Sequence, residues 1–242
     1  MNRDTGDGPV QPTGAIDRWD ETEDEPTVSF SGEEILHLAL SVAVLSVAFT
    51  FALSGTALAI DGKLDESTLL AILPYAVGIV ITSFVLHELA HKVVAQRRYM
   101  WAEFRASWTN LLVGLLVSMG LGVVFAAPGA VHIYGQATRR DSGVISIVGP
   151  ALNLGLALIA LPMFLFTPEL CVARHANLWQ VVVFVNVFLA GFNMLPIPPL
   201  DGSKVWAWSK LAYLSTLLVI AAFAYVVFDP SVVPGVSPAT GC

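Results

Sequence analysis

The chain has 242 residues, of which 55% are hydrophobic and 13% are charged, and its formal net charge is −7. Apolar runs long enough to cross a bilayer recur along it, which argues against a large soluble domain and indicates a polytopic α-helical membrane protein. The acidic balance argues against a nucleic-acid partner.

The chain begins with a polar segment, residues 1–31, that is rich in Asp, Glu, Gly, Pro and Thr. This segment has too little apolar surface to fold alone, so we expect a disordered acidic tail on the cytoplasmic side. No basic start is followed at once by an apolar stretch, so the segment is not a signal peptide. We expect a membrane-embedded domain over residues 32–228 and a short tail over residues 229–242.

Five apolar segments have the length of a transmembrane helix, and they cover residues 33–60, 69–95, 143–166, 178–195 and 210–228. A sixth apolar segment, residues 111–131, is interrupted by glycines, and Pro128 and Gly129 predict extended chain near its end. The predicted fold is an all-α polytopic membrane protein with about five full transmembrane helices. The sixth segment either crosses the membrane or forms a re-entrant hairpin with short β-strand character.

The distribution of Lys and Arg distinguishes these two topologies, because basic residues favour the cytoplasmic side. With a re-entrant hairpin, ten of the twelve basic residues lie on the cytoplasmic side, whereas a crossing segment gives seven against five. The ten are Arg3, Arg18, Lys92, Arg97, Arg98, Arg105, Arg139, Arg140, Lys204 and Lys210. The count favours the re-entrant hairpin, and extended backbone at membrane depth is tolerated where it lines a protein cavity.

The second apolar segment carries the motif His87-Glu88-Leu89-Ala90-His91. Two histidines four residues apart lie on one face of a helix, so both imidazoles can reach one metal ion. Glu88 follows the first histidine, where it can act as a base toward water at the metal. Three ionisable groups in a membrane-length apolar run are costly unless they face the protein interior. The motif lies near the basic end of its segment, so we expect the site near the cytoplasmic face.

A second group of polar residues follows the segment 178–195. Three prolines break the helix there, and they precede Asp201 and Gly202. In the re-entrant topology, Asp201 reaches the same membrane face as His87 and His91, and two histidines with one carboxylate and a water make a catalytic zinc site. We expect Gly202 to permit a tight turn. His132 is a further candidate ligand, but a fourth protein ligand would close the position that water needs, which favours a role as a strand residue.

These motifs resemble the site-2 protease family of intramembrane zinc metalloproteases. The resemblance rests on residues 87–91, 149–153 and 193–202, in the order of the family, and it covers roughly residues 74–204. It implies that His87, His91 and Asp201 bind one Zn²⁺ ion per chain and that Glu88 activates water. The chain has no room for a PDZ insert between residues 105 and 149 and no C-terminal nucleotide-binding module, so it resembles a compact archaeal or bacterial type.

The resemblance also implies further site residues and a substrate. It places Asn193 and Asn153 near the substrate carbonyl. It assigns the strand that pairs with extended substrate to Pro128, Gly129, Ala130, Val131, His132, Ile133 and Tyr134. The expected partners are the lipid bilayer and a transmembrane protein that is cleaved within its span. The sequence does not predict the oligomeric state.

Two alternatives remain open at this point. A membrane zinc protease of another type, such as a prenyl-protein-processing enzyme, generally takes its third ligand from a glutamate on a later helix, and the apolar segments after His91 contain no glutamate. A zinc transporter or a non-enzymatic metal-binding protein is the other alternative. A transporter needs a polar path across the whole bilayer, whereas the polar groups here gather toward one face.

Overall fold

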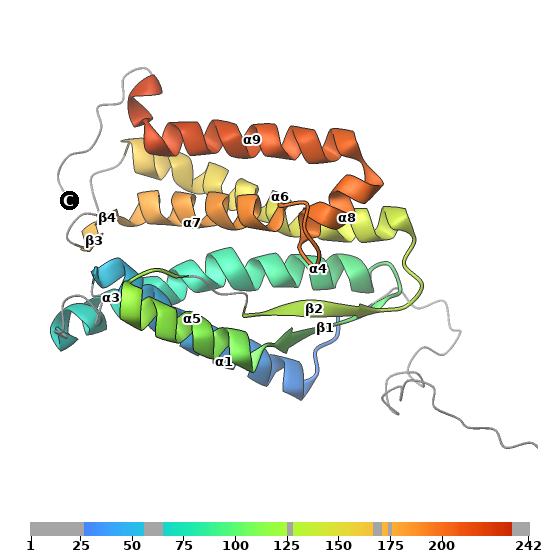
Figure 1. Ribbon diagram of the computed structural model, residues 1–242, viewed down its shortest axis with the longest axis horizontal. Helices are drawn as coiled ribbons and strands as arrows, with labels where there is room; N and C mark the ends of the chain where they lie inside the picture. The colour runs from blue at the N-terminus through green and yellow to red at the C-terminus, as the bar shows by residue number, and fades with distance from the viewer. Residues whose placement is uncertain (1–26, 56–64, 125–127, 167–170, 174–175, 234–242) are drawn as a thin grey trace, which may run out of the picture.

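The computed structural model describes residues 27–55, 65–124, 128–166, 171–173 and 176–233 (Figure 1). Of the described residues, 76% lie in helices, so this part of the chain is mostly helical. Within the described residues, four helices are long and apolar enough to cross a membrane: α1 (Gly32–Ser54), the continuous helix Glu66–Gln96, α6 (Arg139–Phe166) and α9 (Lys210–Phe228). Four of the five expected spans therefore correspond to long helices. The fifth corresponds to α7 (Leu178–Asn193), which has only 16 residues.

The continuous helix Glu66–Gln96 has three parts. They are α3 (Glu66–Val80), the π-helical turn η2 (Ile81–Val85) and α4 (Leu86–Gln96), which carries the two-histidine motif. Asp65 caps α3, because its carboxylate accepts hydrogen bonds from Ser67 and Thr68. The hydroxyl groups of the same two residues hold the pKa of Asp65 down to about 2, with Thr68 as the larger influence.

The remaining elements are short. They are β1 (Trp101–Ala106), α5 (Trp108–Leu121), β2 (Gly129–Tyr134), β3 (Cys171–Ala173), β4 (Ala176–Asn177), α8 (Asp201–Trp208) and the 3-10 turn η3 (Pro230–Val232). In the β3–β4 hairpin, Cys171 is disulfide-bonded. The chain has one other cysteine, Cys242, which lies outside the described residues.

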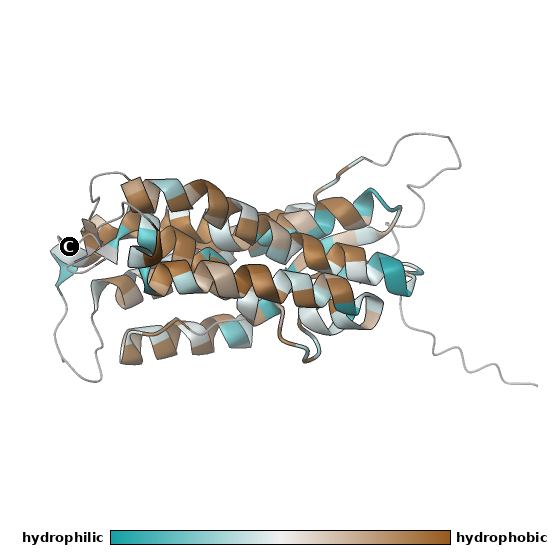
Figure 2. Cartoon of the chain, turned by 90° about the horizontal axis from the view of Figure 1, so that it is seen from above, coloured by the Kyte–Doolittle hydropathy of each residue, from teal (hydrophilic) through white to brown (hydrophobic). Residues whose placement is uncertain are grey.

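Helix α4 lies in the middle of the molecule, between two groups of elements (Figure 1). On one side lie α6, α7, α8 and α9, and on the other lie α1, α5 and the β1–β2 sheet. Hydrophobic residues cover the helices along most of their length, and hydrophilic residues gather toward the ends (Figure 2). This distribution is that of helices whose outer faces contact lipid.

Two apolar clusters pack neighbouring elements against one another, one on each side of the molecule. The first joins α6, α7 and α9, and it consists of Ala157, Ala160, Phe164, Val183, Val187 and Val227. The second joins α1, α3, the π turn, β1 and α5, and it consists of Leu45, Val80, Phe84, Phe104 and Leu111. Because Phe84 and Phe104 also pack edge to face at a centroid distance of 5.7 Å, the sheet is attached directly to the helix that carries the histidines.

Strands β1 and β2 form an antiparallel hairpin whose register runs from Trp101 opposite Tyr134 to Ala106 opposite Gly129. The sequence predicted the extended chain of β2 but not β1. Helix α5 lies between the two strands in the sequence. The N–H of Ser107, just after β1, donates to the carbonyl of Pro128, just before β2, at 2.8 Å. The residue before α5 is therefore in contact with the residue before β2.

The expected acidic tail falls largely outside the described residues, which begin at residue 27. The last residues of that tail pack on the protein: the N–H of Ser29 donates to the side-chain oxygen of Gln96 at 3.0 Å. Ser31 caps α1 by accepting a hydrogen bond from the N–H of Glu34 at 3.1 Å. The expected C-terminal tail begins with η3, and residues 234–242 lie outside the described part.

Candidate metal centre

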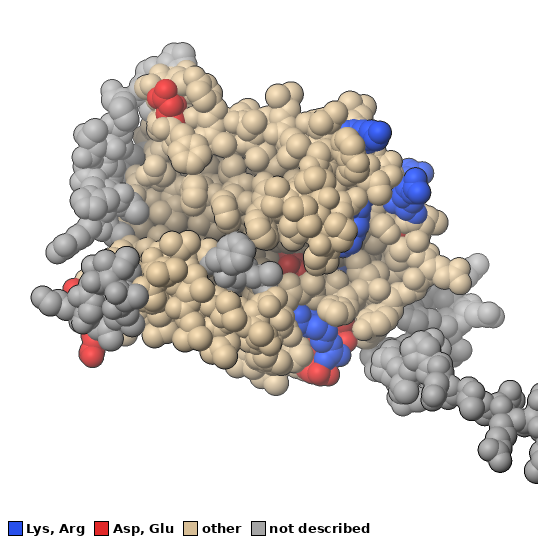
Figure 3. All heavy atoms as spheres, in the orientation of Figure 1, with Lys and Arg blue, Asp and Glu red and all other residues tan. Residues whose placement is uncertain are grey.

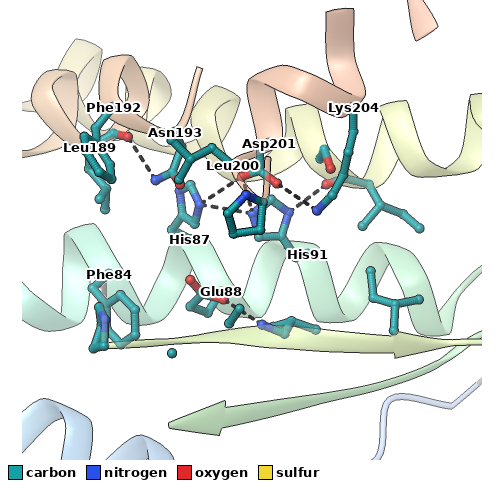
Figure 4. Close-up of a pocket in the computed structure, with 18 residues that line it drawn as sticks. Phe84, His87, Glu88, His91, Leu189, Phe192, Asn193, Leu200, Asp201 and Lys204 are labelled. Carbon is teal, nitrogen blue, oxygen red and sulfur yellow. Dashed lines mark hydrogen bonds and ion pairs between the residues drawn. The ribbon is translucent and has the colours of Figure 1, made fainter. Parts of the chain in front are cut away.

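Three buried side chains from two helices meet beside α4 (Figure 4). His87 and His91 are one turn apart on α4, and their Nε2 atoms are 3.0 Å from each other. The Oδ2 atom of Asp201, the first residue of α8, lies 3.5 Å from His87 Nε2 and 3.1 Å from His91 Nε2. Ligand atoms around a tetrahedral zinc ion lie roughly 3.3 Å apart, because each is about 2.0–2.1 Å from the metal. The three atoms therefore have the spacing of zinc ligands.

The other ring nitrogen of each histidine is already engaged. His91 Nδ1 lies 2.7 Å from the carbonyl oxygen of Ile145, which can only accept, so the imidazole carries its proton on Nδ1. His87 Nδ1 lies 2.5 Å from Asn153 Oδ1. Both Nε2 atoms are thus left with a free lone pair that points to Asp201. This arrangement is the one in which histidine binds a metal, so the residues fit a zinc ion.

The two imidazoles pack directly on the backbone of α6. A Cβ atom added at Gly149 would lie 2.5 Å from His91 Nε2 and 2.7 Å from His87 Cε1. Any side chain at this position would occupy the space of the histidines. The motif at residues 149–153 therefore contacts both histidines. Its first residue, Gly149, leaves space for the two imidazoles, and its last, Asn153, is hydrogen-bonded to His87.

Asp201 is held in place by the contact between α8 and the end of α7. A Cβ atom at Gly202 would lie 2.2 Å from the carbonyl oxygen of Met194, so glycine is needed here for close packing. Gly202 is helical, and the expectation that it permits a tight turn after Asp201 was wrong. The second oxygen of Asp201 lies 3.8 Å from Lys204 Nζ.

Glu88 points away from the three-residue cluster and toward β2 (Figure 4). Its Oε2 accepts a hydrogen bond from the N–H of Val131 at 3.2 Å. Glu88 and the three-residue cluster line the same cavity, and this cavity has a volume of about 150 Å³. An acidic side chain is visible in the hollow between the two halves of the molecule in Figure 3.

The cavity is bordered by the outer edge of β2. Since the N–H of Val131 donates to Glu88, it points away from β1, and in an antiparallel pair the backbone groups of Gly129 and Ile133 face the same way. All three residues line the cavity. The side chains of Ala130, His132 and Tyr134 are exposed, and of these three only Ala130 also borders the cavity. His132 belongs to neither the cluster nor the cavity lining.

The outer edge of β1, in contrast, is closed by side chains. Lys92 Nζ donates to the carbonyl of Ala102 at 2.7 Å and to Glu34 Oε2 at 2.7 Å. The other oxygen of Glu34 accepts from the N–H of Phe104 at 2.9 Å. Lys92 and Glu34 are both buried, and Lys92 directly follows His91. This ion pair ties the sheet to the histidine helix and leaves β2 as the edge that faces the cavity.

The two candidate asparagines occupy different places. Asn193 lines the cavity, and its Nδ2 donates to the carbonyl of Leu189 at 3.0 Å. Asn153 lies behind His87 and does not line the cavity, so its contact with the imidazole favours a positioning role. Asn186 of α7 was not predicted as a site residue, and its side chain contacts Asn153. An asparagine in the middle of an apolar, membrane-length segment was the signal that could have identified it.

Comparison with known proteins gives several similar sequences. The chain is 36% identical over 206 residues to "Putative zinc metalloprotease MJ0611" of Methanocaldococcus jannaschii, which covers 82% of this chain and 97% of that protein. It is 32% identical over 154 residues to "Putative zinc metalloprotease YwhC" of Bacillus subtilis, covering 56% of this chain and 69% of the relative. It is 34% identical over 145 residues to "Putative zinc metalloprotease Rip2" of Mycobacterium tuberculosis, covering 50% and 52%. No protein-family model matches the chain, and no solved structure gives a significant match.

Proposed function

Because the chain belongs to the site-2 protease family and is a zinc metalloprotease, we propose that it hydrolyses a peptide bond within a transmembrane segment of another membrane protein. The observation that carries this proposal is the position of the histidine pair. His87 and His91 lie on a 31-residue helix that is long and apolar enough to cross a bilayer. A protease site on such a helix is accessible to peptide bonds at membrane depth.

In this proposal, His87, His91 and Asp201 bind one zinc ion per chain. Zinc, when bound, supplies a Lewis acid that activates water and polarises a carbonyl group. Their three ligand atoms leave a fourth tetrahedral position open, as a catalytic site requires. The third member of the cluster is an aspartate at the start of α8, which argues against a prenyl-protein-processing type, whose third ligand is a glutamate on a later helix.

Glu88 is the general base and general acid. Its carboxylate takes a proton from the attacking water and returns that proton to the nitrogen of the leaving amine. Asn193 lines the same cavity and has a second amide hydrogen besides the one bound to Leu189, so it can donate to the oxygen of the reacting carbonyl.

The outer edge of β2 binds the substrate. A helical peptide hides its carbonyl groups in hydrogen bonds, so the segment to be cleaved must be extended. An extended peptide can add to a free strand edge through backbone hydrogen bonds. The outward-facing backbone groups of Gly129, Val131 and Ile133 line the cavity beside Glu88, which supports a substrate strand formed by residues 128–134.

The site faces the cytoplasm, and the segment containing α5 is re-entrant. Three observations support this topology. The ends of that segment meet at Ser107 and Pro128, and α5 has 14 residues, about 21 Å of helix at ~1.5 Å per residue. The Lys and Arg side chains seen in Figure 3 lie in the half of the molecule where α4 ends, and basic residues favour the cytoplasm. Cys171 is disulfide-bonded in the β3–β4 hairpin at the opposite end, as in an oxidising compartment.

Fragment analysis of membrane proteins tests the proposed function. Cells that express the wild-type chain and cells that express Glu88→Gln are compared by quantitative proteomics of membrane-protein termini. We expect termini that lie within transmembrane segments and that require the wild-type chain. Wild-type-dependent termini found only in soluble domains or loops would contradict intramembrane cleavage, although they would still identify a protease.

A further inference from the structure

Asn186 is a fully buried polar residue within the apolar helix α7. Its side chain has an exposed fraction of 0%, and its neighbours Val183 and Val187 belong to the apolar core. A buried amide is costly unless it is hydrogen-bonded. The Nδ2 atom of Asn186 donates to the carbonyl of Val182 at 2.9 Å, and its Oδ1 atom accepts from Asn153 Nδ2 at 2.8 Å.

Two backbone carbonyls determine the orientation of both amides. Asn153 Nδ2 also donates to the carbonyl of Ser83 at 2.9 Å. A carbonyl can only accept, so the nitrogen of Asn153 must face Ser83, and the nitrogen of Asn186 must face Val182. Asn153 Oδ1 is then the atom that faces His87 Nδ1, at 2.5 Å. An oxygen there accepts, so the proton of His87 is held on Nδ1 and the lone pair on Nε2.

We propose that Asn186 is a positioning residue for zinc binding and acts through Asn153 on His87. This inference rests on the proposed function, in which His87 Nε2 binds zinc. The hydrogen bonds form one directed chain, from His87 through Asn153 and Asn186 to the carbonyl of Val182. Asn186 does not contact His87 itself. It restricts the side-chain amide of Asn153, and that amide fixes the tautomer and the ring orientation of His87.

The zinc dissociation constant of the purified chain in detergent, measured by competition with a chelator, tests this proposal. Loss of an outer partner of a metal-bound histidine typically weakens metal binding 10–100-fold, and we expect about tenfold for Asn186→Leu. Asn186→Asp should retain wild-type affinity, because a buried, neutral carboxyl group can both accept from Asn153 and donate to Val182. Ser83→Ala is the matched control, since it keeps the backbone carbonyl that Asn153 uses.

A double-mutant cycle separates this role from a general effect on packing. If Asn186 acts through Asn153, the Asn186→Leu substitution should have no further effect on zinc affinity in an Asn153→Leu background. If Asn186→Leu does not yield folded protein, the smaller Asn186→Ala replaces it in the cycle. Wild-type affinity in Asn186→Leu, or the same loss from this substitution in both backgrounds, would overturn the proposal.

His87→Ala distinguishes failure of this inference from failure of the proposed function. Loss of zinc in His87→Ala together with wild-type affinity in Asn186→Leu would overturn the role of Asn186 alone. Wild-type affinity in His87→Ala would remove His87 from the zinc ligands, and the proposed site would fail with it.

Discussion

The carboxylate of Glu88 accepts a hydrogen bond from the backbone N–H of Val131, so the residue next to the first histidine is in contact with the free edge of β2. A peptide that added to this edge would bring a carbonyl oxygen to the same N–H. Glu88 would then lose this partner at the moment when substrate arrives. In the proposed mechanism, strand addition therefore frees the carboxylate that acts as the base.

Glu88→Gln is expected to abolish proteolysis without loss of zinc. Removing a general acid–base group typically lowers the rate 10²–10⁴-fold, whereas zinc content should remain at about one ion per chain because Glu88 does not belong to the ligand cluster. Elemental analysis of the purified variant and cleavage of a substrate identified by proteomics give the two readouts. Glu66→Gln, in the first turn of α3, is the matched control. Zinc loss in Glu88→Gln would make Glu88 a ligand.

Gly149→Ala is expected to weaken zinc binding, because the added methyl group would lie 2.5 Å from His91 Nε2. Overpacking of this kind costs about 1–3 kcal/mol, which corresponds to a roughly 5- to 150-fold higher zinc dissociation constant. Gly155→Ala lies on the same helix, and its methyl group would meet no atom within 4 Å. The control should keep wild-type affinity, and equal affinities in the two variants would contradict the steric explanation.

Lys92→Met is expected to destabilise the fold. It removes the cation from the buried pair with Glu34 and from the carbonyl of Ala102, and breaking a buried pair on one side costs about 3–5 kcal/mol. Unfolding of the purified chain in mixed micelles measures the loss. Arg97→Met, at the end of α4 and exposed to solvent, should change the free energy of unfolding by less than about 0.5 kcal/mol. Similar losses in both variants would argue against a structural role for the pair.

The re-entrant topology predicts which side of the membrane each end of α6 faces. A cysteine at position 139, with Cys171 and Cys242 replaced by serine, should react with a membrane-impermeant maleimide only after cell lysis. In the wild-type chain, Cys171 should react in intact cells only after an impermeant reductant has been added, because it is disulfide-bonded. Labelling of position 139 in intact cells would mean that the segment containing α5 crosses the membrane.

The substrate is expected to be a membrane helix that unwinds easily. Glycine or proline introduced near the cleavage site should speed cleavage, and a run of leucines should slow it, because glycine and proline disfavour the helix by about 1 and 3 kcal/mol relative to alanine. Paired substrates with these changes, cleaved by the same preparation, give the comparison. Equal rates for both would argue against capture of an extended strand at β2.

The sequence predicted the parts of the fold whose residues interact over short distances. His87 and His91 are four residues apart, and their common face follows from helix geometry. The helix over residues 210–228 follows from its apolar length. The strand β1 was not predicted, because the groups that hydrogen-bond its outer backbone edge, Lys92 and Glu34, lie on other elements.

The contacts that support the candidate site could not be predicted from the sequence. The contact of Asn186 with Asn153 joins residues that are 33 positions apart, and no periodicity connects them. The reason for glycine at position 202 is the carbonyl of Met194 against which it packs, and this contact exists only once α8 has docked on the end of α7.

The π turn Ile81–Val85 has a consequence for comparing this chain with its relatives. A π turn accommodates one residue more than an α turn, and the helices on either side keep their faces. Deletion of one residue within 81–85 would therefore restore a continuous α-helix while Ile79 and His87 stayed on the faces that they now present. The carbonyl of Ser83, which Asn153 uses, would be displaced. Relatives that are one residue shorter in this helix are best aligned with a gap inside 81–85, and such chains would need a different anchor for the asparagine behind the first histidine.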